Sequence, residues 1–373
     1  MNQRQAVVIG AGPAGLASAA ELQGAGLSVT VLEQSDGVGS SWRNRYDTLR
    51  LNSSRPFAKL PGARYAKGTP MFPTRDELVE YLEDYAAGNG LDVRLRTRVE
   101  RVERDGADWL LRTSDGELRV EQVIVAAGYH RDPFLPDWPG RARFQGRLVH
   151  AAAYRNADPF LGADVLAVGS GSSGMEIAYD LLSSGAARVR LSVRTPPNIL
   201  IRMPLGPLFA RLLMKLGPRR ADRVISFIRR HEIGDLTELG LPEPEEGVFS
   251  RLLRLGVAPA IVDKEVIQAI KDRRIEIVAG VESLDETGVE LADGSRIEPE
   301  VVIAATGFRP GLEPMLGHLG VLDERGLPRA TGETEAAPGL RFVGYVPRPA
   351  HIAYIGREAR RTARAMALGL PAG

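Results

Sequence analysis

The chain carries one glycine spacing twice, each time directly after a short apolar run. The two sets are Gly10, Gly12 and Gly15, then Gly169, Gly171 and Gly174. In a nucleotide-binding strand–helix unit the first glycine allows a tight turn, the second lets a pyrophosphate approach the backbone, and the third lets the helix pack against the strand. The helix that follows points its first amides at the phosphates. The repeat therefore predicts two dinucleotide sites, with electrons passing from one bound nucleotide to the other.

The residue that ends the second strand of each unit separates the two nucleotides. The first unit has Glu33 there, whereas the second has Arg194 followed by Thr195. A carboxylate accepts hydrogen bonds from a ribose 2′-hydroxyl and repels a 2′-phosphate, while the donor fork of arginine suits that phosphate. The sequence predicts FAD or NAD at the first site and NADPH at the second. The alternative for Arg194 is a solvated residue at a strand end.

The repetition extends beyond the glycines. Apolar strand patterns at 6–9, 28–32 and 91–125 have counterparts at 165–168, 189–193 and 274–306. This favours a duplicated α/β unit over a short-period solenoid. We expect two Rossmann-like dinucleotide-binding domains. Their predicted extents are 1–155 with 295–373 for the discontinuous FAD-binding domain, and 156–294 for the NADPH-binding domain with a helical insert at 197–263.

The insert contains two apolar stripes at helical spacing, with many arginines among them. The stripes are Leu205, Leu208, Phe209, Leu212, Leu213 and Leu216, then Val224, Ile225, Phe227 and Ile228. The alternatives are a helical insertion packed on the nucleotide domain, a lid over a substrate pocket, and a basic helix on a membrane surface. We favour packing on the domain for most of these residues.

Composition limits the partners. A net charge of +1 gives no reason to expect nucleic acid or an anionic membrane as the main partner. The absence of cysteine excludes disulfides, a redox-active cysteine pair and thiolate metal sites, and the histidines show no close pairing, so we expect no metal. No uninterrupted run of about 18 apolar residues suggests a membrane span. We expect a cytoplasmic protein; a homodimer and weak peripheral membrane association through 205–230 stay open.

The stretch between the two glycine fingerprints carries a further pattern. It reads Phe144-x-Gly146-x-x-x-His150-x-x-x-Tyr154. With Asn52-Ser53-Ser54 after the segment 39–42, and with the late Ala305-Thr306-Gly307, it resembles the class B flavin-containing monooxygenases. Within that class the likeness is greatest to the YUCCA-type monooxygenases and their small bacterial relatives, and it covers nearly the whole chain.

The resemblance implies FAD, NADPH and molecular oxygen as reactants. In such enzymes NADPH reduces the flavin, oxygen adds at flavin C4a, and the peroxide oxygenates a small or medium, mostly apolar substrate. This chemistry belongs to the cofactor and needs no side-chain nucleophile. Two alternatives stay open: an NADPH-dependent flavin oxidoreductase or oxidase with an external acceptor, and a regulatory protein that binds FAD and NADPH without turnover.

The resemblance also implies site residues. By matching position, Asn52 lies near the reactive flavin edge, while His150 and Tyr154 belong to the linker, where His150 acts on conformation rather than in proton transfer. These three are the candidate catalytic residues. The expected cofactor-binding residues are Gly10, Gly12, Pro13, Ala14, Gly15, Glu33, Gln34, Gly39, Ser41, Trp42, Val102, Ala127, Gly128, Gly344, Gly169, Ser170, Gly171, Ser172, Ser173, Gly174, Arg194, Thr195, Thr306 and Gly307.

Two departures from the family pattern bear on the substrate. Tyr154 stands where the Baeyer–Villiger enzymes have tryptophan, which favours oxygenation at N or S over ester formation from ketones. Asn52 stands where YUCCA-type enzymes have histidine, which counts against indole-3-pyruvate. Decarboxylation of a 2-oxo acid, as YUCCA-type enzymes perform it, is kept as an alternative.

Overall fold

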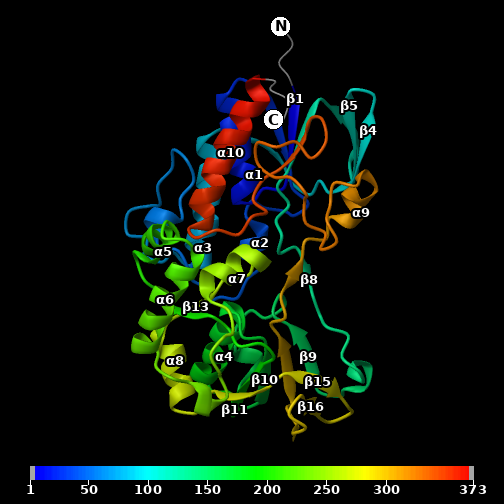
Figure 1. Cartoon of the computed structure of the whole chain (residues 1–373). Helices are drawn as coiled ribbons and strands as arrows, with labels where there is room; N and C mark the ends of the chain where they lie inside the picture. Colours follow the sequence, from blue (N-terminus) through cyan, green and yellow to red (C-terminus); the bar gives the residue numbers. More distant parts are fainter. Residues whose placement is uncertain (1–4, 369–373) are drawn as a thin grey trace. The chain divides into compact units, whose positions relative to one another are not determined.

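The computed structural model describes residues 5–368, which form two compact α/β units (Figure 1). The chain passes between the units several times. The first unit takes its described residues from 1–43, 54–132 and 308–373, and the second consists of 44–53 and 133–307. The short strands β8 (Asp132–Pro133) and β19 (Phe308–Arg309) lie where the chain leaves one unit for the other.

The first unit is built on a five-stranded sheet. Across the sheet the strands run β20 (Leu340–Phe342), β7 (Gln122–Val125), β1 (Gln5–Ile9), β2 (Ser28–Leu32) and β3 (Asp92–Arg94). Every neighbouring pair is parallel. Residues 6–9 of β1 are buried without alternation, as expected for a central parallel strand that is covered on both faces.

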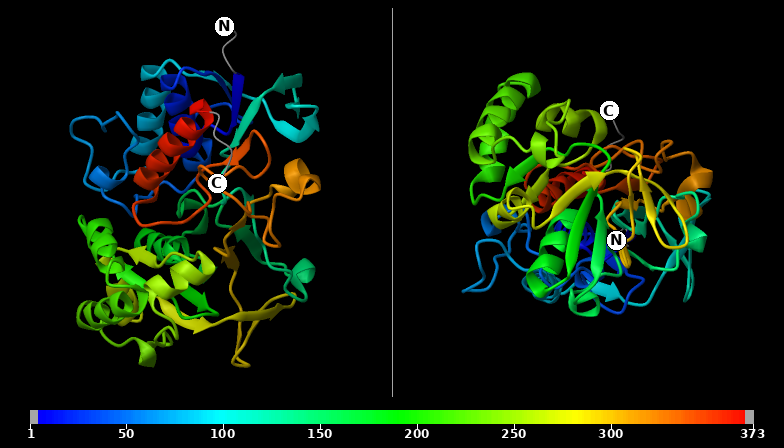
Figure 2. Two further views of the ribbon diagram at one scale, coloured as in Figure 1. Left: turned by 45° about the horizontal axis from the view of Figure 1, so that its top comes forward. Right: turned by 90° about the horizontal axis from the view of Figure 1, so that it is seen from below.

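Helices and a small antiparallel sheet complete the first unit. They are α1 (Pro13–Gly24), α2 (Ser40–Arg43), α3 (Arg75–Gly88), α9 (Glu313–Leu316) and α10 (His351–Leu368), with strands β4 (Val99–Asp105), β5 (Asp108–Thr113) and β6 (Gly116–Val120). The helices α1 and α10 lie side by side (Figures 1 and 2). The helix α3 starts at a capping box in which Thr74 and Glu77 bond each other's backbone amides.

The second unit repeats this design. Its parallel sheet runs β14 (Glu276–Ala279), β11 (Arg188–Val193), β10 (Asp164–Val168), β18 (Val301–Ala304) and β9 (Arg147–His150). The other elements outside the insert are α4 (Ser172–Ser184), α8 (Lys264–Lys271), β15 (Val281–Leu284), β16 (Val289–Leu291) and β17 (Arg296–Ile297). Four strands of each sheet correspond in order. The duplicated α/β fold predicted from the sequence is therefore confirmed.

The compact units differ in extent from the domains expected from the sequence. Residues 133–155 and 295–307 lie in the second unit, because β9 and β18 pair in parallel at the edge of its sheet. Residues 44–53 lie there as well, and their side chains bond to α4. The predicted boundaries at 155 and 295 therefore do not coincide with the limits of these units.

The insert is helical in its middle and paired at its base. It comprises β12 (Ile199–Ile201), α5 (Gly206–Met214), α6 (Pro218–Glu232), α7 (Val248–Leu255) and β13 (Ala260–Val262). Strands β12 and β13 pair in parallel and bring the two ends of the insert together, which the sequence did not predict. The buried Asp222 of α6 accepts hydrogen bonds from the amides of Phe249 and Ser250, and so caps α7 from outside it.

The described helices do not meet the requirements for crossing a membrane. Within residues 5–368, none of them is both long enough and apolar enough to cross a bilayer.

Candidate functional site

The first fingerprint has the backbone geometry that only glycine tolerates. Gly10 has φ of +106°, and a Cβ there would lie 2.7 Å from the carbonyl oxygen of Ala126. A Cβ on Gly15 would lie 1.7 Å from the carbonyl oxygen of Gly10, which is closer than any atomic contact. Gly12 has no atom within 4 Å of its Cβ direction. The backbone is therefore open to a ligand at the glycine where a pyrophosphate would approach.

The surroundings of this turn suit an adenine dinucleotide. Helix α1 begins at Pro13 with Gly12 as its N-cap, and no side chain caps it. Its first amides have no acceptor within the helix and can meet a phosphate. Glu33, at the end of β2, accepts hydrogen bonds from the amides of Ala11 at 2.8 Å and Ser35 at 2.9 Å. These bonds fix the carboxylate beside the turn, where a ribose would lie.

The other predicted residues of the first unit are divided between this turn and the core. The amide of Gly39 donates to the carbonyl of Ala11, and a Cβ on Gly344 would lie 2.8 Å from the Cβ of Ala14, so both glycines adjoin the fingerprint. Ala127 and Gly128 directly follow β7. The predicted Gln34 and Ser41 are exposed and Trp42 is half-buried. The side chain of Val102 is buried in the hydrophobic core of this unit.

The second fingerprint repeats the geometry of the first. Gly169 has φ of +120°, and a Cβ there would lie 2.4 Å from the carbonyl oxygen of Ala305. A Cβ on Gly174 would lie 1.8 Å from the carbonyl oxygen of Gly169, whereas Gly171 faces open space. Gly171 is the N-cap of α4, again without a side-chain cap. The second turn therefore has the same open approach for a phosphate.

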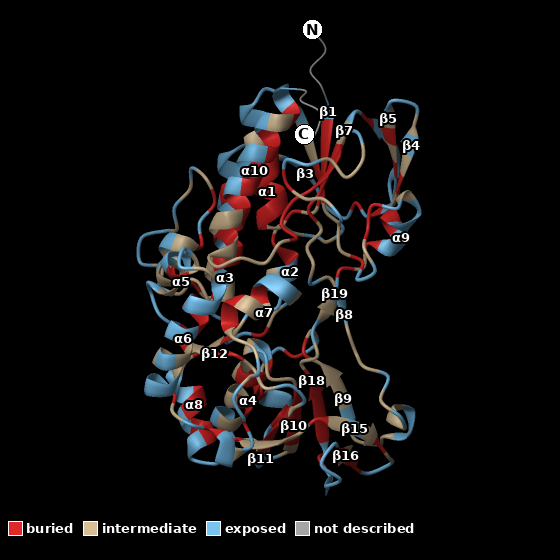
Figure 3. Cartoon of the chain, viewed as in Figure 1, coloured by how far each residue is buried: buried red, intermediate tan, exposed pale blue. Residues whose placement is uncertain are grey.

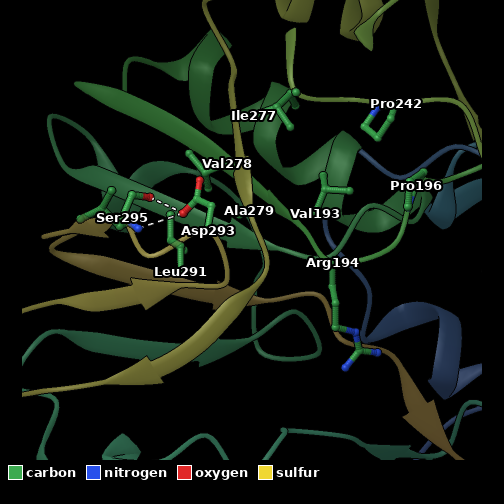
Figure 4. Close-up of a pocket in the computed structure, with 12 residues that line it drawn as sticks. Val193, Arg194, Pro196, Pro242, Ile277, Val278, Ala279, Leu291, Asp293 and Ser295 are labelled. Carbon is green, nitrogen blue, oxygen red and sulfur yellow. Dashed lines mark hydrogen bonds between the residues drawn. The ribbon is translucent and has the colours of Figure 1, made fainter. Parts of the chain in front are cut away.

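Arg194 lines a cavity of about 390 Å³ at the end of β11 (Figure 4). The wall includes Ile277 and Val278 of β14, with Asp293 and Ser295 at the end away from Arg194. The Asp293 carboxylate accepts hydrogen bonds from the amide and hydroxyl of Ser295. Apolar walls with a cation at one end suit a flat base that carries a phosphate nearby.

A smaller cavity of about 90 Å³ adjoins the second fingerprint. Its wall includes Ser170, Gly171, Thr195 and Arg251. The Ser170 hydroxyl donates to the carbonyl of Thr195 at 3.2 Å, which ties the turn to the end of β11. The sequence did not predict Arg251 as a site residue, because its pattern does not distinguish Arg251 from the other arginines of the insert.

Asn52 lies against α4 rather than alone on a loop. Its Nδ2 atom donates to the hydroxyl of Ser172 at 3.4 Å, and its Oδ1 atom accepts from Nη2 of Arg202 at 3.2 Å. The Ser172 hydroxyl also accepts from the amide of Ile261 in β13 at 2.9 Å. Two predicted residues, Asn52 and Ser172, are therefore brought together within the second unit.

Arg202 is the centre of a buried polar cluster that sequence reasoning missed. Its guanidinium is almost fully buried; it bonds Asp263 at 2.6 Å and forms an ion pair with Glu176 of α4. Tyr46 donates to the same Glu176 carboxylate. Burial raises the pKa of Glu176, while the positive charge of Arg202 opposes that rise. Burial likewise raises the pKa of Tyr46, which keeps the phenol neutral and a donor.

Tyr154 is a buried structural donor. Its hydroxyl donates to Asp180 of α4 at 2.6 Å, and its ring stacks on Phe160. Burial, together with the Asp180 carboxylate, raises the pKa of Tyr154, so the phenol does not ionise near neutral pH. The predicted Tyr154 therefore holds α4 in place.

Both ring nitrogens of His150 form hydrogen bonds with backbone groups. Nδ1 accepts from the amide of Ala152 at 3.0 Å, so Nε2 carries the proton and donates to the carbonyl of Gly307 at 3.0 Å. Burial lowers the pKa of His150, which favours the neutral ring. The neighbouring Thr306 hydroxyl donates to the carbonyl of Phe134. Gly307 is the last residue of the second unit before the chain enters the first. His150 therefore binds the backbone at the position where the chain passes from one unit to the other.

Comparison with known proteins agrees with this geometry. Residues 7–201 match the family model described as pyridine nucleotide-disulphide oxidoreductase. The chain is 33% identical over 92% of its length to the indole-3-pyruvate monooxygenase YUCCA1 of Oryza sativa subsp. japonica, of which it covers 87%.

Solved structures share the fold. A flavin-containing monooxygenase from Stenotrophomonas maltophilia is 24% identical with a TM-score of 0.75, with 99% of this chain and 100% of that chain covered. A bacillithiol disulfide reductase from Bacillus cereus is 21% identical with a TM-score of 0.71, at the same coverage. Proteins of different activity therefore share this fold. The chain belongs to the pyridine nucleotide-disulphide oxidoreductase family and, within it, to the class B flavin monooxygenases, enzymes that use FAD and NADPH.

Proposed function

We propose that the first unit holds FAD and the second unit holds NADPH. The observation that carries this proposal is the pair Glu33 and Arg194, each at the end of the second strand behind an open glycine turn. The Glu33 carboxylate would accept from the FAD ribose. Arg194 would bind the 2′-phosphate of NADPH, with the adenine in the cavity that Arg194 lines together with Ile277 and Val278.

The chain's own part in the reaction is to bind, orient and exclude water. Bound FAD, once reduced by NADPH, supplies the activation of oxygen. Asn52 presents an amide whose orientation is fixed by Arg202 and Ser172, with hydrogen-bonding capacity left for a ligand. His150 holds the backbone at Gly307 through its Nε2 proton, a positioning role, and burial favours its neutral form by lowering its pKa. Tyr154 and Asp180 fix α4, whose first turn would face the pyrophosphate.

We infer a small or medium, mostly apolar substrate that is oxygenated at N or S. Tyr154 in place of tryptophan supports this over ester formation. A second candidate is a 2-oxo acid that is decarboxylated as it is oxygenated. Its support is that the relative with 33% identity is named an indole-3-pyruvate monooxygenase. A cytoplasmic location and a homodimer stay predictions.

One experiment tests the activity and separates the substrates. The FAD-loaded protein is reduced with NADPH and exposed to isotopically labelled oxygen gas, with an amine, a sulfide or an aromatic 2-oxo acid present. We expect flavin bleaching by NADPH and one labelled oxygen atom in the amine or sulfide product. Label in a decarboxylated acid would select the second candidate. If NADPH bleaches the flavin and only hydrogen peroxide forms, the protein is an NADPH oxidase. If NADPH does not react at all, the protein is a regulatory protein that binds the nucleotides without turnover.

A further inference from the structure

Apolar side chains on α5 and α6 face solvent. Leu208 and Leu212 lie four residues apart on one face of α5, and Leu205 and Leu216 flank the two ends of the helix at the same spacing. Val224 and Phe227 do the same on α6, and Phe227 is 75% exposed. Figure 3 colours both helices largely as exposed or intermediate. The expectation that these stripes pack on the nucleotide domain is wrong for these six side chains.

The opposite faces of the same helices account for their folding. Leu213, Ala221 and Ile225 are buried in a cluster with Val248 and Phe249 of α7. The cap that Asp222 supplies to α7 fixes the arrangement further. The exposed side chains are therefore not needed to hold the helices in place, and an apolar outer face left in water indicates a binding surface.

The outer faces also concentrate positive charge. Five exposed cations lie on or between the two helices, and no ion pair engages them within residues 5–368. They are Arg211, Lys215, Arg219, Arg220 and Arg223. The single acid between 203 and 228 is Asp222, which is buried and occupied at α7. A net charge of +1 for the whole chain hides this local excess.

We propose that the α5–α6 patch, made of these six apolar and five basic side chains, binds the surface of an anionic lipid bilayer. Apolar side chains on helices enter the boundary of the acyl region, while Lys and Arg pair with acidic headgroups. The charges argue against a second copy of this chain, because a two-fold contact would set the same cations against each other. The apolar component argues against a purely ionic partner such as nucleic acid.

The test is co-sedimentation of the FAD-loaded full chain with vesicles. Vesicles of phosphatidylglycerol and phosphatidylcholine in equal parts are compared with vesicles of phosphatidylcholine alone. We expect binding to the mixed vesicles only, weakening as salt is added because the charges are exposed. Each basic residue near an anionic surface strengthens binding by roughly fivefold, so Arg219→Gln with Arg223→Gln should weaken it about 25-fold.

Matched variants separate the patch from general surface effects. Leu212→Ser with Phe227→Ser should abolish sedimentation, whereas Leu161→Ser, an exposed leucine outside the patch, should not change it. Arg325→Gln with Arg329→Gln, two exposed arginines of the first unit, are the charge control. All variants should keep the wild-type Tm and the wild-type NADPH oxidation without vesicles.

Three results would overturn the proposal. The wild-type chain could stay in the supernatant with the mixed vesicles, or the patch variants could sediment as the wild type does. A dimer that forms with concentration and is lost in Phe227→Ser, without lipid binding, would assign the patch to a second copy.

Discussion

The Nη2 atom of Arg202 lies 3.2 Å from the Oδ1 atom of Asn52. A cation at the base of the helical insert thus orients the amide that the family likeness places at the flavin. The same guanidinium bonds Glu176 of α4 and Asp263. The second fingerprint helix, the insert and the residue proposed to serve the flavin therefore share one buried cluster.

Replacing Arg202 by methionine should destabilise the protein and misplace Asn52. Removing one partner of a buried ion pair leaves the other uncompensated, which costs about 3 kcal/mol. Glu176 would be that partner. We expect a large drop in Tm for Arg202→Met and a smaller one for Arg202→Lys, which keeps the charge but loses the fork. Thermal unfolding measures both.

A double-mutant cycle with Asn52→Ala checks the contact itself. If Arg202 acts through Asn52, the effects of the two substitutions on the rate of flavin reduction should be less than additive. Additive effects would confine Arg202 to a role in stability. Arg325→Lys, an exposed arginine elsewhere, is the control for handling arginine variants.

Replacing Arg194 by serine should erase the preference for NADPH. Losing a charge-assisted bond to the 2′-phosphate costs about 1.5–3 kcal/mol, which is roughly a 10- to 150-fold rise in KM for NADPH. NADH lacks that phosphate, so its KM should stay unchanged and serves as the internal control. Steady-state oxidation of both nucleotides measures the outcome. An equal rise for both would mean that Arg194 supports the fold rather than the phosphate.

The fingerprints were predictable because their requirements are local. Gly10 and Gly169 need positive φ, and Gly15 and Gly174 need a missing Cβ, so the spacing itself specifies the turn. Glu33 follows its strand directly, and its place beside the turn follows from the parallel pairing of β1 and β2. Sequence was therefore enough to predict the two glycine turns and the duplicated sheets.

The Arg202 cluster was not predictable, because its contacts join residues that are far apart in the sequence. Arg202 and Asn52 are 150 residues apart. The pairing of β12 with β13 brings Arg202 beside Asp263, and Asn52 reaches the same cluster from a distant loop that contacts α4. Strands of three residues are too short to show an alternating pattern. The outer faces of α5 and α6 were misassigned because helical spacing identifies an apolar stripe but not what covers it.

Replacing His150 by glutamine should slow electron transfer without releasing FAD. Glutamine can still donate to the carbonyl of Gly307, but the acceptor for the amide of Ala152 is lost. The lost hydrogen bond stabilises the backbone where the chain passes between the units by about 1 kcal/mol. Its loss should therefore slow flavin reduction by severalfold. Stopped-flow absorbance after mixing with NADPH measures this, and the flavin absorbance per protein is the control. Wild-type rates would remove His150 from the mechanism.

His351, the first residue of α10, should make the stability of the protein depend on pH. Its Nδ1 atom is buried and has no hydrogen-bond partner within the described chain, and its ring meets the edge of Tyr129. Burial lowers the pKa of His351 from 6.5 to about 4. Between these values the unfolded chain binds more protons than the folded chain. Stability that is present above pH 6.5 is therefore lost as the pH falls toward 4.

Across this pH window the free energy of unfolding should change by at most about 3 kcal/mol through His351. His351→Phe cannot take up a proton and keeps an aromatic ring beside Tyr129, so its Tm should fall less steeply across this window than the Tm of the wild type. His318→Phe, at an exposed position, is the matched control and should follow the wild-type curve. Because the wild type and His351→Phe differ in this one titratable group, the difference between their curves reports on His351. Parallel curves for His351→Phe and the wild type would show that the buried ring does not couple protons to folding.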